Sequence, residues 1–170
     1  MTALPRVAHH TRERVSREFD DFGPEACVAA ITADLKNENP ELLDMAWKWA
    51  RDVGPPEKMM LGFCMFYRLL VVESRDSSRL LIDGGAAELS GLPRVTAETR
   101  DRIVHEIDEH GVEAFTRSSL DTLERSNPEL LLMAHAFASR YPEYLRIMQG
   151  FGLLYAALSA QAQSDDAYIH

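Results

Sequence analysis

Two copies of the stretch Asn-Pro-Glu-Leu-Leu, at 39–43 and 127–131, decide how this chain of 170 residues is organised. The same shift of 88 residues brings Leu-Pro-Arg-Val at 4–7 onto 92–95. Aligned without a gap, residues 4–70 and 92–158 are identical at 26 of 67 positions. Self-similarity at one fixed shift indicates an internal duplication. The sequence therefore predicts two tandem copies, at 4–73 and 92–161, joined by a connector at 74–91 and followed by a flexible tail at 162–170.

Each copy carries residues that typically begin and end helices, at positions that predict about four helices. Asn39, Pro40 and Glu41 supply an N-cap residue, a proline at the first helical position and a carboxylate near the positive end of the helix dipole. Gly23 and Gly111 stand where a helix is expected to stop. Apolar residues recur three and four positions apart, and no alternating stretch predicts a strand.

We expect an all-α protein of about eight helices, with the two copies related by an approximate two-fold axis around one shared core. Two separately folded units are the alternative, and a short helical turn is expected at 79–82 in the connector.

The composition argues against several classes of protein. The chain has 27 acidic and 18 basic side chains and a formal charge of −9, which repels nucleic acid. Cys27 and Cys64 belong to no CxxC motif or Cys/His cluster, so neither a disulfide scaffold nor a metal site is predicted. The longest apolar run, at 59–72, is interrupted and too short for a membrane span, and residues 1–10 do not resemble a signal sequence. We expect a cytoplasmic protein with reduced thiols, no cofactor and no membrane or nucleic-acid partner.

No arrangement of residues predicts catalysis. The run at 105–110 places two histidines five residues apart, about 140° around a helix, whereas a zinc-protease helix needs them four apart. Neither cysteine has a histidine at a position that would suggest nucleophilic catalysis, and the sequence contains no glycine-rich phosphate-binding loop. An enzyme would need His105, Glu106 or His135 to meet in one shared cleft.

Arginines that recur in both copies form the first candidate binding surface. They are Arg6, Arg12 and Arg14 in the first copy and Arg94, Arg100 and Arg102 in the second. Arginine is the usual partner of phosphate and carboxylate groups, so two such stripes would suit an anion or an acidic partner. The alternative is a solvated surface with internal ion pairs, because a glutamate follows Arg14 and Arg102 at the i,i+4 spacing.

Gly62 and Gly150 interrupt the most apolar helix expected in each copy. Glycine inside a helix costs about 0.5–1 kcal/mol relative to alanine, so its presence needs a reason. One reason is a close crossing of two helices, and the other is space for an apolar ligand. The residues expected around either feature are Met60, Gly62, Phe63, Tyr67, Met148, Gly150, Phe151 and Tyr155.

These observations favour a non-enzymatic, cytoplasmic protein for protein–protein interaction or regulation, built by internal duplication. Its expected partner is another protein or a second copy of itself. The alternative is a small-molecule binding protein with an apolar pocket of methionine and aromatic side chains between the two fourth helices.

Overall fold

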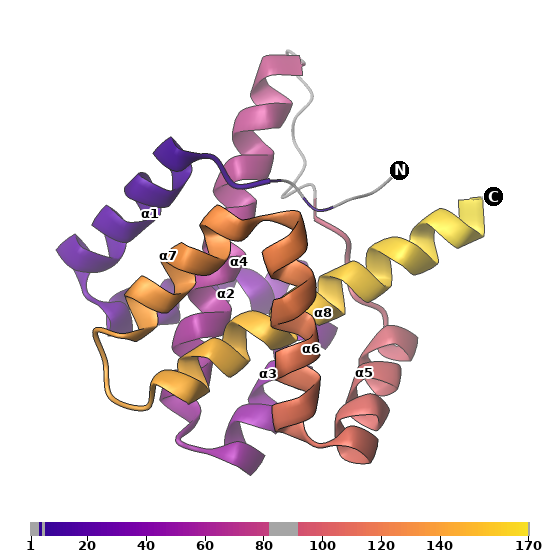
Figure 1. The fold of residues 1–170 in the computed structure, drawn as a ribbon. Helices are drawn as coiled ribbons and strands as arrows, with labels where there is room; N and C mark the ends of the chain where they lie inside the picture. The colour runs from indigo at the N-terminus through magenta and orange to yellow at the C-terminus, as the bar shows by residue number, and fades with distance from the viewer. Residues whose placement is uncertain (1–3, 5, 82–91, 170) are drawn as a thin grey trace.

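The computed structural model describes residues 4, 6–81 and 92–169, in which the chain forms eight helices and no strand (Figure 1). The prediction of an all-α protein is therefore confirmed. The helices of the first half, residues 4–81, are α1 (His9–Phe22), α2 (Pro24–Glu38), α3 (Pro40–Val53) and α4 (Pro56–Leu81). Those of the second half, residues 92–169, are α5 (Ala97–His110), α6 (Val112–Ser126), α7 (Pro128–Ala138) and α8 (Tyr144–Ile169).

Local chemistry explains where the shorter helices begin and end. Pro40 and Pro128 open α3 and α7, where the missing N–H of proline costs no hydrogen bond. Gly23 and Gly111 end α1 and α5 with φ angles of 88° and 90°, which residues with a Cβ rarely adopt. Each glycine N–H still bonds to the carbonyl oxygen four residues earlier, and the next helix follows directly.

The two longest helices, α4 and α8, cross at the centre of the molecule, and the other helices surround them (Figure 1). Both contribute fully buried side chains, such as Phe63 and Leu154, to the core. All eight helices supply residues to a single hydrophobic cluster, so the two halves bury their apolar faces together. Within the described ranges, no helix is both long and apolar enough to cross a lipid bilayer.

Two segments differ from the sequence-based prediction. Residues 74–81, assigned to the connector, continue α4 to Leu81, and residues 162–169, assigned to the tail, continue α8 to Ile169. Neither glycine nor proline occurs at 63–82 or after residue 152, so nothing in these stretches stops a helix. The ends of both helices project beyond the rest of the fold (Figure 1). The rest of the connector, residues 82–91, lies outside the described residues. It includes residue 82, the last residue of the helical turn expected at 79–82.

Candidate functional site

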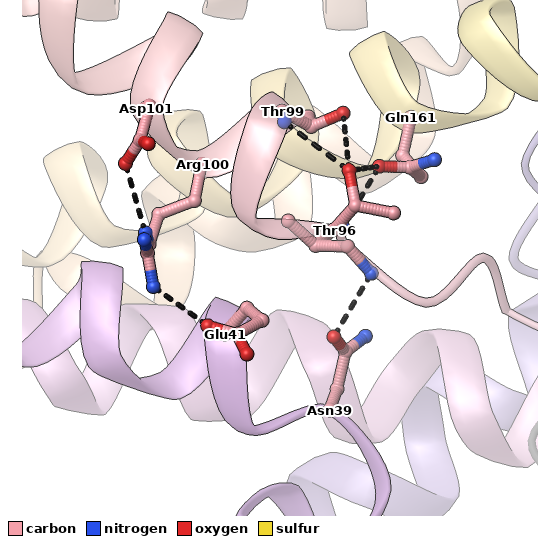
Figure 2. A network of polar contacts seen from close by, with 8 residues as sticks. Asn39, Glu41, Thr96, Thr99, Arg100, Asp101 and Gln161 are labelled. Atoms are coloured by element: carbon pink, nitrogen blue, oxygen red, sulfur yellow. Dashed lines mark hydrogen bonds and ion pairs between the residues drawn. The ribbon is translucent and has the colours of Figure 1, made fainter.

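The two motifs that recur in the sequence contact each other across the halves of the chain. Asn39 donates from Nδ2 to the carbonyl oxygen of Pro93 at 3.2 Å. Its Oδ1 accepts the N–H of Val95 at 3.0 Å, the bond drawn from Asn39 in Figure 2. These backbone groups lie in the segment before α5 and have no partner within a helix. Asn39 is the N-cap residue of α3, as predicted, but its side chain bonds to this distant segment and makes no capping bond to α3 itself.

Glu41 and Glu129, which lie 88 residues apart, each pair with an arginine of the opposite half. Arg100 Nη1 lies 2.6 Å from Glu41 Oε1 (Figure 2), and Arg6 Nη2 lies 2.9 Å from Glu129 Oε1. The pKa of Glu129 is held below its ordinary value, first by its own backbone N–H and then by the hydrogen bond from Arg6. Two arginines of the predicted binding surface thus hold the halves of this chain together.

The other four arginines of that surface have separate environments. Arg12 donates to the carbonyl oxygen of Val7 at 3.0 Å, and Arg14 lies 3.5 Å from Glu18 on the same helix. Arg94 and Arg102 are exposed. Three of the six arginines are therefore paired with carboxylates of the chain itself. The i,i+4 spacing predicted the pair of Arg14, whereas the pairs of Arg6 and Arg100 join residues far apart in the sequence.

Side chains from α4 and α8 cap the first turns of α1 and α5. Glu73 Oε1 accepts the N–H of Ala8 at 2.9 Å and the hydroxyl of Thr11 at 2.8 Å. Gln161 Oε1 accepts the N–H of Thr96 at 3.0 Å (Figure 2). The sequence reasoning missed both contacts, although Glu73 and Gln161 are separated by the same 88 residues as the recurring motifs.

The eight residues predicted around Gly62 and Gly150 lie at the crossing of α4 and α8, and all except Tyr155 are buried. A Cβ built on Gly62 would lie 2.0 Å from the carbonyl oxygen of Ile147, and one on Gly150 would lie 2.1 Å from that of Met59. The backbones of the two helices are therefore in contact at both glycines.

Grooves open on the surface where the outer helices diverge. One lies between α6, α7 and the start of α8 and has a volume of about 480 Å³. A second, of about 470 Å³, lies between α5, α6 and α8, and a third, of about 410 Å³, lies between α1, α2 and α4. His135 lines the first groove and Glu106 the second, while His105 lines none of the three. The side chains that an enzyme would need are thus not brought together in these grooves.

We call the first of these the α6–α7–α8 groove. Its apolar lining consists of Leu120, Leu131, Tyr144, Leu145 and Met148. Its wall along α6 carries the exposed charged residues Glu113, Arg117, Asp121 and Glu124. The side chain of Leu145 is left 64% exposed, and Leu132, which follows Leu131 along α7 but is not part of the lining, is 70% exposed.

An aromatic pair, His135 and Tyr144, forms part of the lining of the α6–α7–α8 groove. His135 Nδ1 contacts Tyr144 Oη, and the two rings stack with their centroids 5.7 Å apart. Partial burial raises the pKa of Tyr144 above its ordinary value. The pair therefore links α7 to the start of α8 within the lining of the groove.

The groove between α1, α2 and α4 contains a bidentate ion pair. Arg68 Nε and Nη2 donate to the two carboxylate oxygens of Glu18 at 2.9 and 3.0 Å. This hydrogen bonding lowers the pKa of Glu18 and raises that of Arg68. The free thiol of Cys27 lies in the same groove, where partial burial raises its pKa, as expected of an unreactive cysteine.

In the described part of the chain, no three His, Cys, Asp or Glu side chains gather closely enough to hold a metal ion. The chain matches no known protein family, no curated protein and no solved structure. The surfaces and contacts described above are therefore the basis for proposing its function.

Proposed function

We propose that this chain is a non-enzymatic helical protein that acts by binding another protein. The observation that carries the proposal is Leu145, which lines the α6–α7–α8 groove and is 64% exposed; a second exposed leucine, Leu132, lies on α7. An exposed leucine by itself is ordinary, but one that extends the apolar lining of a groove forms with it a surface that gains free energy when a partner covers it. The proposal differs from the sequence-based hypothesis in its surface, because Arg6, Arg14 and Arg100 already have carboxylate partners.

We do not propose a ligand between α4 and α8, the alternative that the sequence left open. The contact of backbone with backbone at Gly62 and Gly150 leaves little room there for a small molecule. The cytoplasm is the compartment in which we expect the protein to act, and the free thiols of Cys27 and Cys64 support this expectation.

We further infer that the fold arose by tandem duplication and that its halves are related by an approximate two-fold axis. Three of the four helix pairs have equal lengths, which supports this inference: α1 and α5 have 14 residues each, α2 and α6 have 15, and α4 and α8 have 26, while α3 has 14 and α7 has 11. The matched caps from Glu73 and Gln161 support it too. Superposition of the two halves in an experimentally determined structure tests the inference.

The proposed function is tested by affinity capture from a lysate of the source organism. The baits are the wild type, the double variant Leu132→Glu/Leu145→Glu, and a control, Phe22→Glu. Phe22 is 72% exposed and lines the groove between α1, α2 and α4 instead. We expect the wild type and the control to retain a protein that the double variant loses, while all three show similar thermal unfolding. Retention of the same proteins by all three baits, or of none by the wild type, would refute the proposal.

A further inference from the structure

We infer that the α6–α7–α8 groove binds an amphipathic α-helix with basic side chains along one flank. This inference rests on the proposed function and names the chemistry of the partner. It is carried by the shape of the groove, by its apolar lining and by the charge of its α6 wall.

The size of the groove suits a short helix. Its α6 wall runs from Glu113 to Glu124, which at 1.5 Å per residue is about 16 Å, or three helical turns. Leu120 of α6, Leu131 of α7 and Met148 of α8 supply apolar lining to the groove, and Leu145 is the most exposed of its apolar residues. A helix placed in such a groove would cover these residues with apolar side chains at positions i, i+3, i+4 and i+7.

The charge of the α6 wall determines which charge is favoured on the adjacent flank of the bound helix. The wall holds three acidic residues, Glu113, Asp121 and Glu124, and one basic residue, Arg117, so it has two excess negative charges. Lysine or arginine on the partner would complement this excess and speed association with a chain of net charge −9. An acidic helix would be repelled by the same wall, so the charge gives specificity as well as attraction.

The acidic wall belongs to the second half alone. The residues 88 positions before the four charged residues of the wall are Glu25, Ala29, Ala33 and Lys36, whose charges cancel, so the first half has no excess negative charge there. The residue 88 positions before His135 is Trp47, a larger side chain that is partly buried against the core. The first half therefore offers an internal comparison with the same helix order and without the features that carry the inference.

The test uses the full-length protein and fluorescence anisotropy of two labelled synthetic peptides. Both are helical peptides of about 18 residues, or five turns, with leucine on one face. One carries lysine on the polar face, and the other carries glutamate. We expect saturable one-to-one binding of the lysine peptide, weakened by salt, and at least about tenfold weaker binding of the glutamate peptide.

Two pairs of variants distinguish binding of the peptide in the groove from its general electrostatic attraction to an acidic protein. Asp121→Lys/Glu124→Lys should weaken binding of the lysine peptide by about tenfold or more. The control, Asp44→Lys/Asp108→Lys, changes the net charge equally at exposed positions on α3 and α5, and should change binding by less than about twofold. Leu145→Glu should weaken binding as well, whereas Phe22→Glu should not. All four variants alter exposed side chains, and thermal unfolding verifies that each is folded.

Each opposite result overturns the inference. Equal losses in the two lysine variants would mean that net charge alone attracts the peptide. If the lysine peptide does not bind, the proposal of a basic helical partner is wrong. Saturable binding of an apolar dye in its place would assign the groove to a small apolar molecule. A wild type that sediments as a dimer and becomes a monomer on Leu145→Glu would make a second copy the occupant. If lysate capture succeeds while the peptide fails, the proposed function stands and only the partner's chemistry is wrong.

Discussion

At the scale of single residues, Asn39 makes the contact with the clearest energetic consequence. Its amide satisfies the buried N–H of Val95 and the carbonyl oxygen of Pro93. Alanine at this position would leave the N–H of Val95 without a partner, which costs about 1–3 kcal/mol. We expect Asn39→Ala to lower the free energy of unfolding by about 2 kcal/mol, measured by urea denaturation at equilibrium.

Asn127, 88 residues further on, is the matched control for Asn39. Its Oδ1 is buried and has no hydrogen-bond partner in the described part of the chain. Asn127→Ala therefore removes fewer favourable interactions and should cost less than Asn39→Ala. Equal losses in the two variants would contradict the assignment of Asn39 as the link to segment 92–95.

The ion pair between Glu18 and Arg68 predicts a dependence of stability on pH. The hydrogen bonds from Arg68 lower the pKa of Glu18 below its ordinary value of 4.5. A lowered pKa means that the folded state binds the proton less tightly than the unfolded state does, so the pair stabilises the fold fully above pH 4.5 and loses this effect as pH falls through the folded pKa. We expect Glu18→Gln to be about 1–2 kcal/mol less stable than the wild type near neutral pH, with the difference shrinking in acid.

Thermal or urea unfolding of Glu18→Gln and the wild type across a pH series measures this effect. Glu106→Gln is the control, because Glu106 lies 88 residues after Glu18 while Ala156 stands where the first half has Arg68. The control should lose little stability at any pH. A stability difference for Glu18→Gln that is constant from neutral pH into acid would argue against the ion pair as its cause.

At the scale of helices, the crossing of α4 and α8 depends on two glycines. A methyl group on Gly62 or Gly150 would overlap a backbone carbonyl oxygen of the facing helix, and a carbonyl oxygen cannot turn away as a side chain can. We expect Gly62→Ala and Gly150→Ala each to lower the free energy of unfolding by about 3 kcal/mol or more, as measured by urea denaturation.

Gly152 tests whether contact with backbone, and not glycine in a helix as such, sets this cost. A Cβ on Gly152 would lie 3.3 Å from the methyl group of Thr116, which can shift slightly. Gly152→Ala should therefore be close to neutral, since the gain in helix propensity of about 0.5–1 kcal/mol offsets the tighter packing. Loss of stability in Gly152→Ala as large as in Gly150→Ala would contradict the assigned crossing.

The sequence predicted those elements whose causes are local. Pro40 and Gly23 mark helix ends through their own backbone chemistry, so the boundaries near them were predictable. The contact of Glu73 with the start of α1 was not, because 65 residues separate its oxygen from the N–H of Ala8. The α6–α7–α8 groove was also missed, since it depends on how α6 and α7 pack on α8, and its residues form no motif along the chain.

At the scale of the whole molecule, polar and aromatic contacts interlock the two halves. Arg140 bonds to Asp20 at 2.7 Å, and Arg146 donates to the carbonyl oxygen of Gly54 at 2.8 Å. The rings of Phe19 and Phe137 pack edge to face with centroids 5.7 Å apart. Together with the hydrophobic cluster that all eight helices share, these contacts make the stability of each half depend on the other.

This dependence predicts one cooperative unfolding transition for the whole chain. Both tryptophans, Trp47 and Trp49, lie in α3, so tryptophan fluorescence reports on the first half, whereas far-UV circular dichroism reports on all helices. Leu123 is buried in α6 of the second half, and Leu123→Ala should cost about 2–5 kcal/mol. In a cooperative molecule, this distant substitution lowers the urea midpoint of the fluorescence signal as much as that of the dichroism signal. If the halves unfolded separately, the fluorescence midpoint would stay at the wild-type value and the dichroism curve would split into two steps.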